Sequence, residues 1–253
     1  MIKLILTDLD HTLLRQDGSI SENTLDILAK CRAKGIKFAI ATARYWIGAE
    51  KYINLLKPDY EITTDGTLIH SRDECIYSCK FSKEETNKIV NCLMESVPDV
   101  EITVAGKKQV LWNSKHISES EKLYKAVYND FSRPVEFGAN KIATKLPEER
   151  IAMEIAEKAD CKLQSYRGEN WYSFMPKESG KTVAIDYLLK ECNIESKDIV
   201  AFGDDLNDIE MLKMCGKGIA VANAVSEVME IADEVTLSND EDGVAEWLKK
   251  NCL

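Results

Sequence analysis

The chain has 253 residues, of which 45% are hydrophobic and 30% are charged. This composition is ordinary for a globular protein, and the length suffices for one large domain or two modest ones. With 33 basic and 43 acidic side chains the formal charge is -10, which argues against a nucleic-acid partner because an acidic surface repels phosphodiester backbones. No apolar run approaches the roughly 18 residues of a membrane helix. The chain start does not resemble a signal peptide and the eight cysteines form no paired metal motif, so we expect a reduced, cytoplasmic protein without membrane association.

Strands and helices alternate near both ends of the chain. The strands predicted there are 2–8, 36–41, 60–64, 198–202, 218–221 and 234–236. The helices predicted there are 22–34, 45–56, 181–191, 206–214, 225–231 and 241–250. This alternation is typical of a parallel sheet with helices on its faces.

The middle of the chain has a different pattern, in which strands come in adjacent pairs between helices. After a hairpin over 67–70 and 75–80, we expect helices at 83–95, 117–129 and 148–157 and strands near 100–104, 108–112, 141–145, 161–166 and 171–175. Paired strands of this kind indicate an α+β domain with an antiparallel sheet. We therefore expect an α/β core built from residues 1–81 and 177–253, with a second domain, residues 82–176, inserted into it.

Two acidic residues stand where the first predicted strand ends. Asp8 and Asp10 are separated by one residue, so their side chains share a face if the strand persists. Ligands of open α/β sheets bind at this edge. Two carboxylates roughly 4 Å apart repel by about 4 kcal/mol at an effective dielectric near 20, a cost that Mg²⁺ can remove because it prefers oxygen ligands. A simpler role, in which both carboxylates cap the next turn, also fits the pair.

A second acidic cluster follows a predicted strand near the other end of the chain. Asp204, Asn207 and Asp208 have the spacing that places side chains on one face of the first turn of a helix. They come directly after Gly203 and belong to the same sheet edge as Asp8. Acidic residues also favour helix starts because of the helix dipole, so a purely structural role is the alternative.

Two further segments place polar groups at helix starts. Thr42 ends the second predicted strand, and a helix start can bind an anion. Gly180 and Lys181 precede another helix and look like the end of a nucleotide-binding P-loop, but Met175 stands where that motif requires glycine. A lysine at a helix start is unfavourable for the dipole, which hints that Lys181 serves a site.

Together these segments resemble the haloacid dehalogenase superfamily, and within it the Cof-like phosphatases with a type IIB cap. The resemblance covers essentially the whole chain. Its four motifs occur in family order: Asp8-x-Asp10-x-Thr12, Thr42, Lys181, and Gly203-Asp204-x-x-Asn207-Asp208. It implies an α/β fold with a Rossmann-like three-layer core and a parallel sheet, plus an inserted α+β cap domain that determines substrate specificity.

The resemblance also implies roles for the acidic residues. Asp8 would attack phosphorus and form an aspartyl-phosphate, and Asp10 would protonate the leaving oxygen and then activate water. Mg²⁺ would be bound by Asp8, by Asp10 through its carbonyl, and by Asp204. Asp208 would not bind the ion itself but would help to position the residues that do, and it would pair with Lys181.

For the substrate phosphoryl group, the resemblance implies binding by Thr42, Ala43 and Lys181 and positioning by Asn207. The cap must lie between Thr42 and Lys181, because the short interval between Asp10 and Ser21 leaves no room for one.

The chain departs from the family pattern at three positions. His11 and Ala43 stand where glycine is usual, and Asp65 stands where asparagine is usual. We expect a structural role for His11, because histidine tolerates left-handed backbone better than most residues. None of the three departures removes a catalytic group. His70 and His116 are expected on the surface.

The predicted function is Mg²⁺-dependent hydrolysis of small phosphorylated metabolites, sugar phosphates first among them. A phosphotransferase such as a phosphomutase would share the aspartyl-phosphate, but family mutases carry a smaller cap after the first motif. A non-catalytic phospholigand sensor would have no need for Asp10. The sequence identifies neither the substrate nor the oligomeric state.

Overall fold

The computed structural model describes residues 1–72, 74–115, 121–166 and 170–253. The chain folds into two compact units. The first comprises Met1–Ala43, Tyr52–Ile76 and Gly180–Leu253, and the second comprises Arg44–Lys51 and Tyr77–Ser179. Both ends of the chain therefore build the first unit, and most of the second unit lies between them in sequence.

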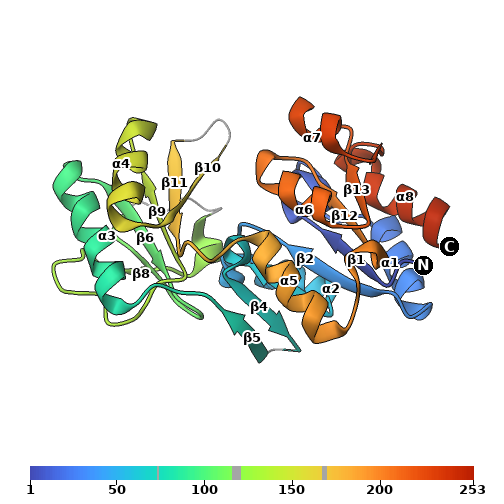
Figure 1. Ribbon diagram of the computed structural model, residues 1–253, viewed down its shortest axis with the longest axis horizontal. Coiled ribbons are helices and arrows are strands. Elements are labelled where there is room, and N and C mark those ends of the chain that lie inside the picture. The colour runs from blue at the N-terminus through green and yellow to red at the C-terminus, as the bar shows by residue number, and fades with distance from the viewer. Residues whose placement is uncertain (73, 116–120, 167–169) are drawn as a thin grey trace. The chain divides into compact units, whose positions relative to one another are not determined.

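A long, mostly parallel sheet forms the centre of the first unit (Figure 1). In spatial order its strands are β14 (Glu234–Val235), β13 (Lys217–Ala220), β12 (Ile199–Gly203), β1 (Leu4–Thr7), β2 (Lys37–Ala41), β3 (Tyr60–Thr63), β4 (Leu68–Ser71) and β5 (Glu74–Ser78). The central strands β1 and β12 are buried along their whole length, as the apolar composition of a doubly covered parallel strand requires.

Helices cover both faces of this sheet. They are α1 (Glu22–Ala33), α2 (Trp46–Leu56), α5 (Lys181–Cys192), α6 (Ile209–Met214), α7 (Ser226–Ile231) and α8 (Gly243–Cys252). From β1 the chain moves outward through β2 to β3, whereas from β12 it moves in the opposite direction through β13 to β14. Because such crossovers are right-handed, α1 and α6 lie on opposite faces; α8 packs on α1, and α5 packs on α6.

The reversal of strand order between β1 and β12 decides where a ligand can bind. Thr7 of β1 is in register with Ile40 of β2 and Phe202 of β12, so the three strands end at the same level. Parallel strands that diverge in this way leave a crevice at their carboxyl ends. The loops that follow these three strands carry Asp8, Thr42 and Asp204.

The second unit contains a mainly antiparallel six-stranded sheet. Its strands, in spatial order, are β10 (Lys162–Ser165), β11 (Trp171–Met175), β9 (Lys141–Lys145), β6 (Glu101–Ala105), β7 (Val110–Trp112) and β8 (Val127–Tyr128). The helices α3 (Lys83–Ser96) and α4 (Glu149–Ala159) pack together and share a core with the sheet that includes Ile89, Leu93, Ile142 and Phe174. A capping box between Ser82 and Glu85 starts α3.

The predicted fold class, a parallel α/β core with an additional α+β part, is confirmed. The helix predicted over 117–129 is wrong in its described portion, where a short turn at Glu121–Tyr124 is followed by β8. Tyr124 packs edge-on against Tyr45, and this tertiary contact outweighs local helix propensity. His70 is buried rather than exposed, because β4 pairs with β3 inside the first unit; His116 lies outside the described residues. That the second unit serves as a cap stays a prediction.

Candidate active site

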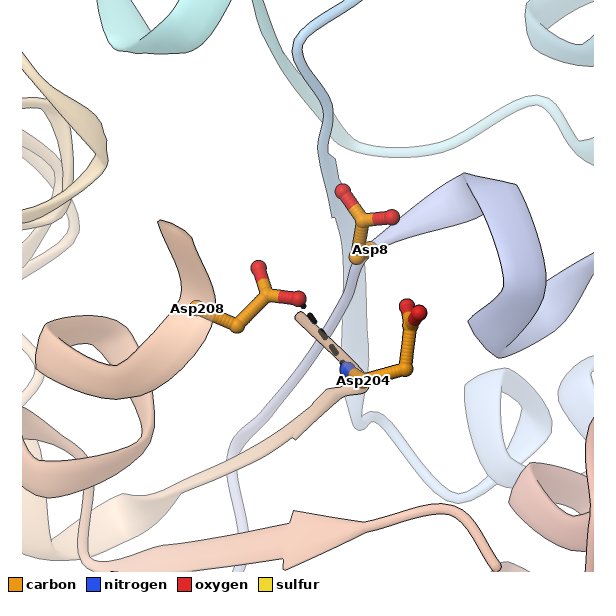
Figure 2. A group of neighbouring side chains, drawn as sticks. All are labelled: Asp8, Asp204 and Asp208. Atoms are coloured by element: carbon orange, nitrogen blue, oxygen red, sulfur yellow. Dashed lines mark hydrogen bonds between the residues drawn. The ribbon is translucent and has the colours of Figure 1, made fainter. Parts of the chain in front are cut away.

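Three carboxylates converge at the carboxyl edge of the large sheet (Figure 2). Asp8 follows β1, Asp204 follows β12, and Asp208 lies one turn further on. Each offers an oxygen atom within 4.8 Å of the others. The N–H group of Asp8 donates to the carbonyl of Phe202 at 3.0 Å, so the parallel pairing of β1 and β12 continues as far as Asp8.

Lys181, the first residue of α5, supplies a positive charge to this group. Its Nζ donates to Asp8 Oδ1 at 2.8 Å and to Asp208 Oδ1 at 2.6 Å, which is the predicted pairing with Asp208. All three side chains are buried. Burial alone would lower the pKa of Lys181, but the charges of Asp208 and Asp8 outweigh it and keep the pKa above its usual value. Lys181 is therefore a fixed cation.

Asp208 holds the loop between β12 and α6 as well as the lysine. Its Oδ2 accepts from the N–H groups of Asp204 and Asp205, at 3.1 and 3.3 Å. A Cβ atom at Gly203 would lie 2.6 Å from Cβ of Asp208, so glycine is needed where the side chain folds back on the strand end. Asp208 is thus fully engaged with Lys181 and backbone amides, and Asp8 and Asp204 remain the carboxylates available for a cation.

The two available carboxylates are short of positive charge. Burial raises the pKa of Asp8 above its ordinary value, and Lys181 offsets this only in part. Burial also raises the pKa of Asp204 to about 7, although the hydroxyl of Thr12 donates to Asp204 Oδ1 at 2.6 Å and lowers it. Raised pKa values at two buried carboxylates are expected of a divalent-cation site without its ion, because the positive charge of the ion would lower both pKa values.

The loop after β1 differs from the simple extension of a strand. β1 ends at Thr7, and Leu9–Leu13 form an irregular turn in which Asp10 is extended, with φ -71° and ψ 130°, and His11 has φ 58°. The strand does not persist to Asp10, so the condition for Asp8 and Asp10 to share a face is not met. The acidic group found among the described residues contains Asp208 instead of Asp10. His11 lies in the left-handed region of the backbone, as expected where glycine is usual, and its structural role stays a prediction.

The remaining predicted residues lie in loops at the same edge. Thr42 is buried directly after β2, where its N–H donates to the carbonyl of Ile62 at 2.9 Å. Ala43 follows it and is half-buried, as is Asn207 in the turn between Asp204 and Asp208. Contact of these three residues with a phosphoryl group stays a prediction.

Sequence reasoning missed the contact between Gly66 and Gly180, which sets the position of Lys181. Gly66 has φ 84°, and a Cβ atom there would lie 2.3 Å from the carbonyl carbon of Gly180. Gly180 itself has φ 134° and caps α5, so two glycine backbones touch immediately before the lysine. The Asp65-Gly66 pair was a recognisable turn signal, but its partner Gly180 could not be read from the sequence because the two are far apart along the chain.

Replacing Gly66 by alanine should displace the start of α5. Gly35→Ala is a matched control, because Gly35 also has φ 84° but an alanine Cβ atom there would have no neighbouring atom within 4 Å. Both variants carry the penalty of about 1–2 kcal/mol for a left-handed alanine, whereas Gly66→Ala adds a backbone clash. We expect Gly66→Ala to unfold at lower urea concentration than Gly35→Ala and to lose catalytic activity; equal unfolding midpoints would contradict this role of the contact.

A model of the family described as haloacid dehalogenase-like hydrolase matches residues 5–248, nearly the whole chain. The chain belongs to the haloacid dehalogenase-like hydrolases. The predicted superfamily is confirmed.

Related proteins agree with this membership. Phosphatase YwpJ of Bacillus subtilis is 25% identical, covering 98% of this chain and 99% of YwpJ. The crystal structure of SMU.1108c from Streptococcus mutans matches with a TM-score of 0.85 and 28% identity, over 99% of this chain and 98% of the other. The subclass IIB sugar phosphatase BT4131 has the same fold, with a TM-score of 0.82 and 23% identity over 98% of each chain. The prediction that the protein is a phosphatase-type enzyme is confirmed. None of the described helices is long and apolar enough to span a membrane.

Proposed function

We propose that this haloacid dehalogenase-like hydrolase is a Mg²⁺-dependent phosphomonoesterase that works through an aspartyl-phosphate. The observation that carries the proposal is the environment of Asp8. This carboxylate is buried, contacts the fixed cation Lys181 through Oδ1, and lies beside Asp204. Such a carboxylate has one oxygen held and the other available to attack phosphorus.

In the proposed reaction Asp8 Oδ2 attacks the phosphorus atom, and the bond to the leaving oxygen breaks. Asp10 protonates that oxygen and then takes a proton from the water that hydrolyses the acyl phosphate. Lys181 holds Asp8 in place and neutralises part of the charge of the phosphoryl oxygens. Thr42, Ala43 and Asn207 position the phosphoryl group from the neighbouring loops.

The donor set fits Mg²⁺. Asp8 and Asp204 present carboxylate oxygens within 4.8 Å, and Mg²⁺ typically uses one or two carboxylates together with waters and a substrate oxygen. We propose that both bind the ion, together with the carbonyl of Asp10. When bound, the ion supplies the positive charge that allows a phosphate dianion to approach two carboxylates.

The proposed substrates are small phosphorylated metabolites, with sugar phosphates first. A neighbour with this fold, BT4131, is named as a sugar phosphatase, and the net charge of -10 disfavours nucleic acid. We further propose that the second unit is the cap that contacts the leaving group, and that the enzyme works in the cytoplasm. Phosphoryl transfer to a second hydroxyl and phospholigand sensing without turnover are the alternatives.

A phosphatase panel tests the proposal. Wild-type protein is incubated with p-nitrophenyl phosphate and a set of sugar phosphates, with and without Mg²⁺, and free phosphate is measured. We expect Mg²⁺-dependent release from at least some substrates. A mutase would instead move the phosphoryl group without releasing it, and a sensor would bind but leave every compound intact; either outcome contradicts hydrolysis.

Mg²⁺ should stabilise the fold more at pH 8 than at pH 5. The pKa values of Asp8 and Asp204 are raised by folding, that of Asp204 to about 7. Protonation of both carboxylates therefore stabilises the metal-free fold at a pH below their unfolded pKa values near 4. The contribution of Asp204 is lost as the pH rises through about 7, and that of Asp8 is lost as the pH rises through its own raised pKa. A cation bound to the ionised carboxylates restores it, by about 2.7 kcal/mol at 100 times its Kd. Thermal unfolding with MgCl₂ or NaCl of equal ionic strength measures the effect; an equal Mg²⁺ shift at both pH values would refute it.

A further inference from the structure

A pocket of about 430 Å³ lies wholly within the second unit and shares no residue with the cluster around Asp8. Its walls come from three segments. They are the end of β5 and the residues after it, with Ser78 and Lys80, the turn between β6 and β7, with Lys107 and Lys108, and the segment before β9, with Phe137 and Asn140. The volume is in the range of sites for small molecules.

Hydrogen bonds hold the three walls together. Asn140 is buried, and its amide donates to Ser78 Oγ at 3.0 Å and to the carbonyl of Cys79 at 2.7 Å. Its backbone N–H donates to the carbonyl of Ala105 at 2.8 Å, directly before the turn. Asn140 thus connects the segment before β9 both to the end of β5 and to the β6–β7 turn. The pocket is therefore largely formed before any ligand binds.

The charge of the pocket is the reverse of the charge of the protein. Lys80, Lys107 and Lys108 line it, and no Asp or Glu does. Within the described ranges, these three exposed lysines make no ion pair. The same holds for Lys145 and Lys158 elsewhere in the second unit, whereas Lys83 and Lys125 pair with glutamates. Neighbouring ammonium groups repel one another, so three of them around one pocket carry a cost in free energy that a bound anion would offset.

We propose that this pocket binds a small polyanion, a molecule with two or more phosphate or carboxylate groups. Its anionic groups would contact the three lysines, the hydroxyl of Ser78 can donate to it, and the ring of Phe137 gives it an apolar wall. Because Ser78 ends β5 and Lys80 lies in the segment that joins β5 to α3, a bound polyanion would hold this part of the chain to the β6–β7 turn. The site does not depend on the proposed catalytic function.

Isothermal titration of metal-free protein with tripolyphosphate tests the proposal, with citrate as the carboxylate counterpart. We expect Lys107→Gln/Lys108→Gln to weaken a binding component by about tenfold or more, the worth of a charge-assisted hydrogen bond. The matched control is Lys158→Gln/Lys190→Gln, which removes the same charge from exposed positions outside the pocket. Hydrogen exchange with tripolyphosphate should slow in segments 77–81 and 106–109 of the wild type.

Three results would overturn the site. The wild type could bind neither anion at millimolar concentration. The Lys107→Gln/Lys108→Gln variant could bind as tightly as the wild type, which would place the anion elsewhere, for example at Lys181. The control could weaken binding as much as the pocket variant, which would reduce the effect to overall charge. Loss of binding in the pocket variant alone, together with local protection from exchange, supports it.

Discussion

Replacing Asp8 by asparagine is expected to lower the rate of phosphoester hydrolysis by about 10⁴-fold or more, because removal of a covalent nucleophile leaves only binding and electrostatic contributions. Asparagine has the same shape and can still accept a hydrogen bond from Lys181. Burial disfavours the ionised form of Asp8, so the metal-free variant should be at least as stable as the wild type. Activity assays and urea unfolding of the same preparation measure both effects.

Two further variants separate the role of Asp8 from general effects of charge. Asp10→Asn removes both the acid of the first step and the base of the second. With p-nitrophenyl phosphate, whose leaving group needs no protonation, the first step should persist while hydrolysis of the acyl phosphate is blocked, so rapid-quench mass spectrometry should find a phosphoryl group on this variant and none on Asp8→Asn. Asp26→Asn, an exposed position on α1 whose carboxylate pairs with Lys30, should leave the rate unchanged. If Asp8→Asn retains wild-type activity, the aspartyl-phosphate mechanism is wrong.

The location of the site was predictable because it depends on strand ends. The apolar runs before Asp8, Thr42 and Asp204 mark buried parallel strands, and parallel strands end at a common edge. The registers of Thr7 with Ile40 and Phe202 then bring the loops together. Each of these residues is a weak indication of a site when taken alone. Together they indicate one site, because the three strands end at the same edge of the sheet, beside the reversal of strand order.

The orientation of individual side chains was not predictable from spacing. Asp208 was expected to share a helix face with Asp204, but its carboxylate turns back to the N–H group of Asp204 because Gly203 leaves room for it. The close approach of Gly66 to Gly180 is equally invisible, since it joins loops that are distant along the chain. Tertiary contacts determine these side-chain and backbone positions, and residue spacing along a single sequence does not predict such contacts.

Replacing Lys181 by methionine is expected to cost both activity and stability. The lysine is the buried cation that two carboxylates, Asp8 and Asp208, share. Removal of one partner from a buried ion pair typically costs about 3–5 kcal/mol because the other charge stays behind, and loss of a donor to the phosphoryl group typically costs about 10²–10³-fold in rate. We expect the loss of stability in urea unfolding at pH 8 in metal-free buffer. We expect the loss of activity in an assay of the same protein after Mg²⁺ is added.

The pH dependence distinguishes lost charge from lost packing. Without the lysine, Asp8 can regain part of the lost stability by taking up a proton, so the difference in unfolding free energy between wild type and Lys181→Met should shrink between pH 8 and pH 5. A packing defect would be the same at both pH values. Lys190→Met, on the exposed side of the same helix, should change stability little at either pH. If Lys181→Met unfolds like this control, Lys181 does not neutralise the acidic cluster, and the electrostatic basis of the proposed site fails.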